Sequence, residues 1–100
     1  MPRYFFTKLN PPRASFAQDM NDEERRLMGE HAVYWKALAE KGVALLFGPV
    51  GDPKGVYGIC ITQVENPEEI HSITANDPVI RAGLGFTVET YPMPDIVRGR

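Results

Sequence analysis

The chain has 100 residues, of which 43% are hydrophobic and 24% charged, with a formal net charge of −2. This length supports a single hydrophobic core, so we treat residues 1–100 as one domain. The charges nearly cancel and the basic residues are scattered, which argues against nucleic acid or an anionic membrane surface as the main partner. No apolar run approaches the roughly 20 residues of a membrane-spanning helix.

Cysteine and histidine are scarce, which limits the chemistry that the chain can carry. The single cysteine, Cys60, excludes an internal disulfide framework and suits a reducing cytosol, so we expect a cytoplasmic protein. The amino-terminal segment becomes polar too soon for a secretory signal. Cys60 lies in a strand-like run, so we expect a small buried hydrophobic residue and not a nucleophile. With two histidines and no cluster at ligand spacing, we expect no metal site and no cofactor.

The first predicted elements are a strand over Arg3–Leu9 and a long loop over Asn10–Asp19. The paired prolines Pro11-Pro12 prevent the strand from continuing. Connections of this length are often functional, which makes Arg13 and Phe16 candidates for binding a ligand. The alternative is a surface loop in which Phe16 is fixed in the core.

One long amphipathic helix is predicted over Asp22–Gly42. Asn21 as N-cap and Glu24 three residues later form the pattern of a capping box. The buried stripe contains His31, and burying an unpaired polar group costs roughly 2–7 kcal/mol, so this imidazole requires a partner. By itself, a lone histidine in such a stripe is more often a hydrogen-bonded core residue than a catalytic one. The apolar stripe recurs at spacings of three and four residues and consists of Leu27, Met28, His31, Tyr34, Trp35, Leu38 and Ala39.

Two further strands are predicted, over Val43–Phe47 and Val56–Val64. Gly48-Pro49 is expected to end the first of them, and Gly51–Gly55 has the composition of a turn, so the two strands form a hairpin. Neither P-loop spacing nor GxGxxG is present, which favours a hairpin turn over a phosphate-binding loop. We expect Gly48 and Pro49 to shape a pocket and not to react.

A second, short helix is predicted from Asn66, which is followed by proline and by acidic residues. Asn76-Asp77-Pro78 ends this helix and begins another short turn that runs through Arg81. Asp77 is an ordinary N-cap in this pattern, but a carboxylate has further acceptor sites and can pair with another group as well. The last strand is predicted over Phe86–Tyr91, and the residues from Pro92 onward form a loosely held tail.

The element order β-α-β-β-α-β predicts an α+β fold of the ferredoxin-like type, an antiparallel sheet with two helices on one face. In this fold the first and third strands are central and the two helices run antiparallel. His31 on the first helix is therefore expected to lie near Asp77, which follows the second helix. The long loop and Gly48-Pro49 close over the same end of the sheet.

The predicted strands are apolar on both faces, although two helices can cover only one of them. Phe5 and Phe6 show this in the first strand, because neighbouring residues point to opposite faces. An exposed apolar face of this size is rare in soluble monomers. We therefore expect a two-fold homodimer that packs sheet against sheet, with further pairing of dimers left open.

Three segments, Gly29–Gly42, Phe47–Val50 and Ala75–Leu84, resemble the YciI-like (YCII-related) family. They supply the histidine in the first helix, the Gly-Pro after the second strand, and the Asp-Pro followed by Ala-Gly. The resemblance covers nearly the whole chain and implies a ferredoxin-like fold assembled as a dimeric α+β barrel. It also implies an active-site pair, which in this sequence is His31 and Asp77. Family members often carry an aromatic residue after the Asp-Pro, where this chain has Val79.

A carboxylate that binds one nitrogen of an imidazole fixes its tautomer and leaves the other nitrogen for a ligand, which suits general acid–base catalysis. We therefore expect a small cofactor-independent enzyme, a lyase or isomerase that acts on a small organic substrate through His31 and Asp77. The alternative is a non-catalytic dimeric binding or accessory protein that uses the same cleft. Trp35 and Tyr57 are expected in the core or at the dimer face, and both are candidates for contact with the ligand.

Overall fold

The computed structural model describes residues 1–99, and Arg100 at the end of the predicted tail lies outside the described residues. The order of elements agrees with the predicted β-α-β-β-α-β arrangement, to which the short helices α1 and α4 are added. The elements are β1 (Arg3–Asn10), α1 (Phe16–Asp19), α2 (Asp22–Glu40), β2 (Ala44–Val50), β3 (Tyr57–Val64), α3 (Glu69–Ala75), α4 (Pro78–Arg81) and β4 (Thr87–Met93).

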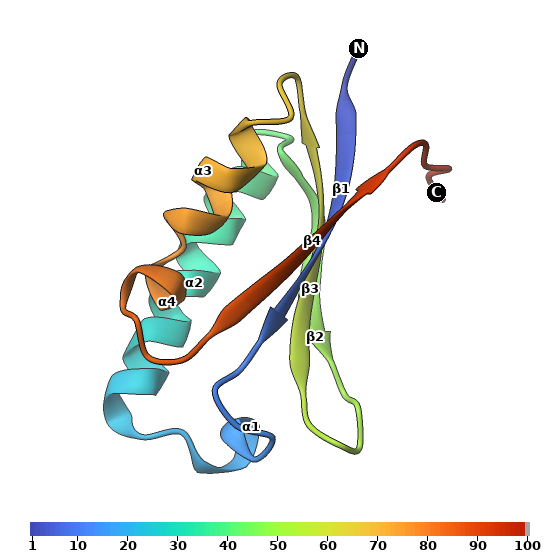
Figure 1. Ribbon diagram of the computed structural model, residues 1–100. Helices are drawn as coiled ribbons and strands as arrows, with labels where there is room; N and C mark the ends of the chain where they lie inside the picture. Colours follow the sequence, from blue (N-terminus) through green and yellow to red (C-terminus); the bar gives the residue numbers. More distant parts are fainter. Residues whose placement is uncertain (100) are drawn as a thin grey trace.

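The four strands form one antiparallel sheet in the order β2-β3-β1-β4. Strands β1 and β3 occupy its centre, as predicted. Helices α2, α3 and α4 lie on one face of the sheet, and within residues 1–99 no helix covers the other face (Figure 1). Thr7 of β1 is paired with Cys60 of β3 and with Thr90 of β4, and all three point toward the helices. The structure therefore has the expected α+β fold of the ferredoxin-like type.

The long helix begins and ends where the sequence indicates. The Asn21 side chain accepts a hydrogen bond from the backbone of Glu24, whose side chain accepts one from the backbone of Asn21, so the capping box is present. Gly42 follows the helix with a φ of 77°, a left-handed conformation that glycine adopts without strain. The Asn66 side chain accepts from the backbone of Glu68, but α3 itself begins only at Glu69.

Both edge strands are longer than the sequence indicates. Gly48-Pro49 does not end the second strand, because Pro49 pairs with Gly58 and β2 continues to Val50. Pro92 likewise belongs to β4, where it pairs with Phe5, and not to the tail. Proline lacks the N–H that a central strand must donate, but an edge strand tolerates it where that N–H would point away from its only neighbour.

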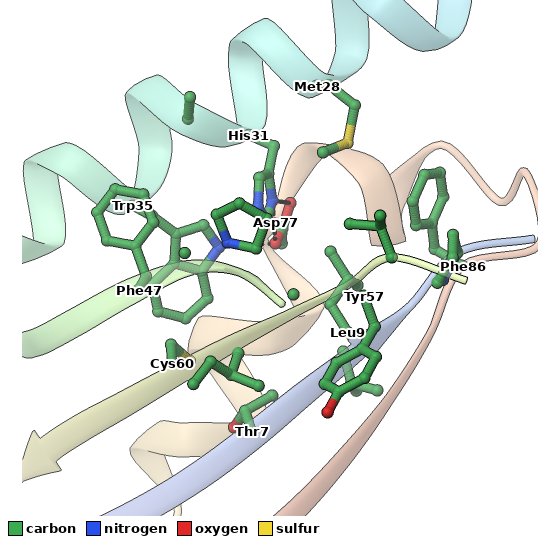
Figure 2. Close-up of a pocket in the computed structure, with 18 of the residues that line it drawn as sticks. Thr7, Leu9, Met28, His31, Trp35, Phe47, Tyr57, Cys60, Asp77 and Phe86 are labelled. Carbon is green, nitrogen blue, oxygen red and sulfur yellow. Dashed lines mark hydrogen bonds and ion pairs between the residues drawn. The ribbon is translucent and has the colours of Figure 1, made fainter. Parts of the chain in front are cut away.

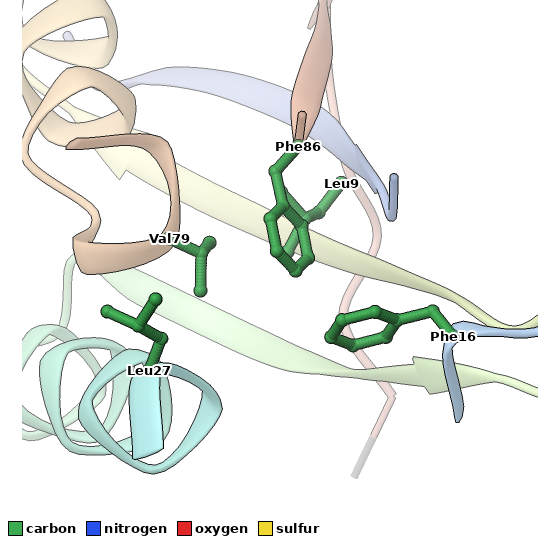
Figure 3. Close-up of a cluster of buried hydrophobic side chains, with 5 residues drawn as sticks. All are labelled: Leu9, Phe16, Leu27, Val79 and Phe86. Atoms are coloured by element: carbon green, nitrogen blue, oxygen red, sulfur yellow. The ribbon is translucent and has the colours of Figure 1, made fainter. Parts of the chain in front are cut away.

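A cluster of buried hydrophobic side chains joins the β1–α1 segment to the helices and the sheet. Phe16 packs edge-on against Phe86 with ring centroids 5.0 Å apart, and Val79 is fully buried beside them. Phe16 is therefore fixed in the core, in agreement with one of the two roles considered for it. Figure 3 shows the five members of this cluster, which are Leu9, Phe16, Leu27, Val79 and Phe86.

Arg13 joins the β1–α1 segment to the start of α2. Its Nη1 and Nη2 each donate to one oxygen of the Glu24 carboxylate at 2.8 Å, and its Nε donates to Asp19 at the same distance. Glu24 is only 5% exposed, which is unusual for a glutamate. The hydrogen bonds from Arg13 and from the backbone of Asn21 hold the pKa of Glu24 at about 2, below its ordinary value of 4.5. These hydrogen bonds from Arg13 to Glu24 and Asp19 have a structural role, and they use the donors of the Arg13 guanidinium.

The sheet face that carries no helix has the predicted apolar side chains, together with the charged Lys8 and Glu89. Phe6 pairs with Ile61 on one side and stacks on Tyr91 on the other, with ring centroids 6.5 Å apart. Leu46 and Tyr91 are 50% and 52% exposed. We refer to this surface as the outer face, and its apolar members include Phe6, Leu46, Ile59, Ile61 and Tyr91.

Within residues 1–99, no helix combines the length and the hydropathy that crossing a membrane requires.

The Arg13–Glu24 pair predicts how stability depends on pH. Because folding lowers the pKa of Glu24, the pair contributes fully above pH 4.5 and its contribution is lost as the pH falls toward 2. Glu24→Gln keeps an oxygen for the Asn21 cap but removes the charge, so we expect this variant to lose less stability than the wild type across that interval. The urea midpoint measured as a function of pH tests this prediction.

Glu30→Gln is the matched control, because Glu30 pairs with Arg26 on the exposed surface of α2. Exposed pairs contribute little, so this variant should follow the wild-type pH profile. Parallel pH profiles for Glu24→Gln and the wild type would contradict the prediction.

Candidate active site

The structure brings His31 and Asp77 together, although 46 positions separate them in sequence. His31 projects from the middle of α2, and Asp77 is the N-cap of α4 directly after α3. The Nδ1 atom of His31 lies 2.8 Å from Oδ2 and 3.0 Å from Oδ1 of Asp77. The Asp77 side chain is 3% exposed and the His31 side chain 17%. The pair is therefore shielded from water on the carboxylate side and accessible on the imidazole side.

Two further donors hold the Asp77 carboxylate in place. The indole Nε1–H of Trp35 donates to Oδ2 at 2.8 Å, and the backbone N–H of Val79 donates to Oδ1 at 3.1 Å. The predicted capping role of Asp77 and its pairing with His31 thus coexist on one carboxylate.

Trp35 is predicted from the sequence in the core or at the dimer face and as a candidate for contact with the ligand, but its hydrogen bond to Asp77 is not predicted. It lies four positions after His31, so both side chains lie on the same face of α2. A buried indole N–H needs an acceptor, and this spacing could have indicated that Trp35 and His31 share one.

The carboxylate determines which nitrogen of His31 carries the proton in the neutral ring. An ionised carboxylate only accepts hydrogen bonds, so Nδ1 must donate. The second ring nitrogen, Nε2, is then an acceptor, and it has no hydrogen-bond partner within residues 1–99. Such a nitrogen can take a proton from a bound molecule or return one to it.

A cavity of about 370 Å³ lies beside this pair, between α2 and the sheet. Figure 2 shows His31, Asp77 and Trp35 on its helix side, with residues of β1 and β3 opposite. Its walls include residues of the β1–α1 segment, among them Pro11 and Phe16. The sequence-derived candidates that line it are Phe16, His31, Trp35, Gly48, Pro49, Tyr57 and Asp77.

Arg13 is the one sequence-derived candidate that does not line this cavity. Its guanidinium is bound by Glu24 and Asp19, and its carbon Cζ lies 5.4 Å from the ring centroid of Phe16. We therefore leave Arg13 out of the candidate site. Tyr57 contributes to the wall, but its ring lies beneath Lys8, whose Nζ is 4.4 Å from the ring centroid. Because Lys8 belongs to the outer face of β1, the Tyr57 ring turns away from His31.

Burial near the cavity suppresses ionisation of two other side chains. It raises the pKa of Cys60 to about 11, so the thiolate needed for nucleophilic attack is scarce near neutral pH. Burial also raises the pKa of Tyr34, to which the Asp77 charge contributes, and the Tyr34 hydroxyl donates to the carbonyl of Ile73 at 2.7 Å. Neither side chain is in a state to replace His31 as a base.

No group of three or more metal-ligating side chains comes together within residues 1–99.

Similar folds occur in solved structures. The chain resembles a 5-chloro-2-hydroxyhydroquinone dehydrochlorinase from Burkholderia phenoliruptrix, in complex with 2,5-dihydroxybenzoquinone, at 24% identity and a TM-score of 0.57, covering 85% of this chain and 90% of that one. It also resembles an uncharacterized protein from Thermotoga maritima at 12% identity and a TM-score of 0.55, covering 93% and 99%. At these identities the likeness establishes the fold alone.

No curated protein matches the sequence. The YCII-related domain, in contrast, matches residues 5–94, which include every element from the first strand to the last and both members of the His31–Asp77 pair. The chain therefore belongs to the YCII-related family.

Proposed function

We propose that this protein is a small enzyme of the lyase or isomerase type, in which His31 transfers a proton to and from a small organic substrate. The observation that carries the proposal is the Nδ1 contact of His31 to buried Asp77, which leaves Nε2 without a hydrogen-bond partner among the described residues and beside a cavity. Asp77 orients the ring, and Trp35 and Val79 orient Asp77.

The proposed step conserves atoms and charge. Nε2 takes a proton from an O–H or C–H bond of the substrate, and the electron pair of that bond moves into the substrate. In an isomerisation, the protonated ring returns the proton to another atom of the same molecule. In an elimination, the electron pair expels a leaving group from a neighbouring position as its anion, and the protonated ring then releases its proton to water. The Asp77 carboxylate stabilises the positive ring between the two halves of the step.

Other side chains at the cavity support acid–base chemistry over a covalent route. The raised pKa of Cys60 keeps its thiol protonated. The Thr74 hydroxyl donates to the carbonyls of Ile70 and His71, and the Thr7 hydroxyl bonds that of Thr90. None of these groups is hydrogen-bonded to His31, so none has the adjacent base that an activated nucleophile needs.

The dehydrochlorinase that shares this fold adds support from chemistry. By its name that enzyme removes hydrogen chloride from a chlorinated hydroquinone, and its structure holds a dihydroxybenzoquinone. Elimination from a hydroxylated ring requires a base that takes a proton, which is the role proposed for His31. The likeness supports the class of reaction and does not identify the substrate of this chain.

We also propose that two copies associate through the outer face. This face lacks any covering helix, and it exposes Leu46 and Tyr91 next to the stacked Phe6 ring. A second copy related by a two-fold axis would pack its own outer face against this one. The apolar side chains of both outer faces would then be shielded from water. Such a dimer leaves the His31 cavity on the helix side of each sheet.

Replacing His31 tests the proposed chemistry. We expect His31→Gln to lower turnover by about 10²–10⁴-fold, the usual contribution of a general base, and to weaken ligand binding by no more than about tenfold, the usual effect of one hydrogen bond. Halide release from a panel of chlorinated hydroquinones measures turnover, and quenching of the single tryptophan, Trp35, measures binding of an unchlorinated hydroquinone, which is uncharged at neutral pH. His71→Gln is the control, because His71 is exposed on α3 and does not line the cavity.

Equal turnover in His31→Gln and the wild type would remove His31 from the mechanism. Binding without turnover of any panel member by the wild type would favour the alternative of a non-catalytic binding protein.

The shared carboxylate predicts an order of stability among variants. Asp77→Asn replaces one acceptor oxygen with an amide donor, so one of three buried donors loses its partner at a cost of about 1–3 kcal/mol. Trp35→Phe removes only one donor and leaves the carboxylate bound by His31 and Val79. We expect Asp77→Asn to lower the free energy of unfolding by more, for each hydrogen bond lost, than Trp35→Phe does. Urea unfolding of the two variants measures both changes. A near-neutral Asp77→Asn would show that the three donors do not depend on this carboxylate.

A charge on the outer face tests the dimer. We expect the wild type to sediment as a dimer at micromolar concentration and Leu46→Lys to sediment as a monomer of unchanged helix content, because the lysine charge would be buried without a partner. Val33→Lys is the control, since Val33 is 69% exposed on α2. A wild type that sediments as a monomer would refute the proposed association.

A further inference from the structure

We propose that the cavity binds an uncharged ring compound that carries a hydroxyl group, a phenol or a cyclic enol, with this hydroxyl at Nε2 of His31. The inference rests on the proposed role of His31 and goes further, because it names the class of substrate. It excludes carboxylates, phosphates and sulfates as the part of the ligand that enters the cavity.

The first argument is the absence of a cation for a bound anion. Within residues 1–99, no lysine or arginine lines the cavity. Arg13 is bound by Glu24 and Asp19, and Lys8 lies over Tyr57 on the outer face. Burying an ionised group without a partner is costly, so a ligand with a permanent negative charge would be disfavoured here.

Protonation of His31 would not make the cavity favourable for an anion. Its positive charge would already be matched by the Asp77 carboxylate at 2.8 Å. An added carboxylate or phosphate would therefore leave one uncompensated negative charge in the cavity, and it would lie close to Asp77. A neutral hydroxyl that gives its proton to His31 keeps the total charge of the site and ligand unchanged.

The second argument is that the polar side chains that line the cavity from the helix side of the sheet, apart from Nε2 of His31, already have partners. The Trp35 N–H is bound to Asp77, the Thr74 hydroxyl to the α3 backbone, and the Thr7 hydroxyl to Thr90. Nε2 of His31 is the one side-chain nitrogen or oxygen in this part of the described lining without a hydrogen bond. On the helix side, the cavity therefore offers a ligand one strong polar contact.

Because Nε2 of neutral His31 accepts a hydrogen bond, the site selects a ligand group that donates one. With Nδ1 protonated by its bond to Asp77, neutral His31 presents a lone pair at Nε2. A hydroxyl can donate to it, whereas the oxygen of a ketone, ether or ester cannot. A phenolic or enolic hydroxyl is also acidic enough to transfer its proton in the proposed step.

The third argument is the shape and chemistry of the walls. Aromatic rings and a thioether surround the cavity, and such groups pack well against a flat ring. A cavity of roughly 150 Å³ is enough to hold benzene, so about 370 Å³ accommodates a substituted ring or two fused rings. The side chains concerned are Phe16, Met28, Trp35, Phe47 and Phe86.

Three probes that share one ring and one alkyl chain test the inference on the intact protein at neutral pH: 4-ethylphenol, ethylbenzene and 4-ethylbenzoate. They differ in carrying a hydroxyl, no polar group, or a permanent negative charge. Quenching of Trp35 fluorescence and isothermal calorimetry measure the affinity. We expect 4-ethylphenol to bind roughly tenfold more tightly than ethylbenzene, the usual effect of one hydrogen bond, and 4-ethylbenzoate to bind most weakly.

His31→Phe should bring the affinities for 4-ethylphenol and ethylbenzene together, while His71→Phe should leave the wild-type order intact. The order among the three probes on the wild type remains decisive if His31→Phe does not fold. Binding of 4-ethylbenzoate as tight as that of 4-ethylphenol would overturn the inference, as would binding of none of the three.

The same experiment separates this inference from the proposed function. The expected order of affinities, combined with no turnover of any hydroxylated ring, would support the ligand class while the proposed enzyme activity fails. Tight binding of the benzoate, combined with loss of turnover in His31→Gln, would refute the ligand class and leave the acid–base role of His31 standing.

Discussion

The buried carboxylate of Asp77 is the group on which the rest of the site depends. It accepts hydrogen bonds from His31 and Trp35 on α2 and from the backbone of Val79 in α4. These donors come from two helices that are far apart in the chain, so the contact also fixes how the helices lie against each other. A carboxylate in a side chain that is 3% exposed requires such partners, because burial without them would cost several kcal/mol. The packing of the two helices and the proposed proton transfer therefore both require the Asp77 carboxylate.

Much of the fold follows from local patterns in the sequence. The capping box at Asn21, the apolar stripe of α2 and the glycine at its end predict the long helix nearly to the residue. The ferredoxin-like order then predicts that His31 and Asp77 lie near each other, because the connectivity makes the helices antiparallel. The edges of the sheet could not be predicted in this way. Pro49 and Pro92 normally break strands, and only the strand order shows that each lies at an edge.

The details of the site depend on contacts between distant residues, which sequence patterns do not encode. Arg13 has the charge and the loop position of a ligand-binding residue, but its guanidinium is hydrogen-bonded to Glu24 and Asp19. Glu24 has the spacing of a capping residue and serves as one, while its low exposure reflects its second role with Arg13. Trp35 shares a helical face with His31, but its contribution is apparent only once both are found on the same carboxylate. In each case the partner, and not the residue type, determines the role.

The prolines at the two edges have a consequence for how copies of this protein can meet. An open sheet normally exposes unpaired N–H and C=O groups along its outermost strands, and a neighbouring molecule can extend the sheet by hydrogen bonding there. Pro49 in β2 and Pro92 in β4 each remove one of these donors. Growth into a continuous ribbon of strands, the first step toward fibrils, is thereby hindered at both ends of the sheet.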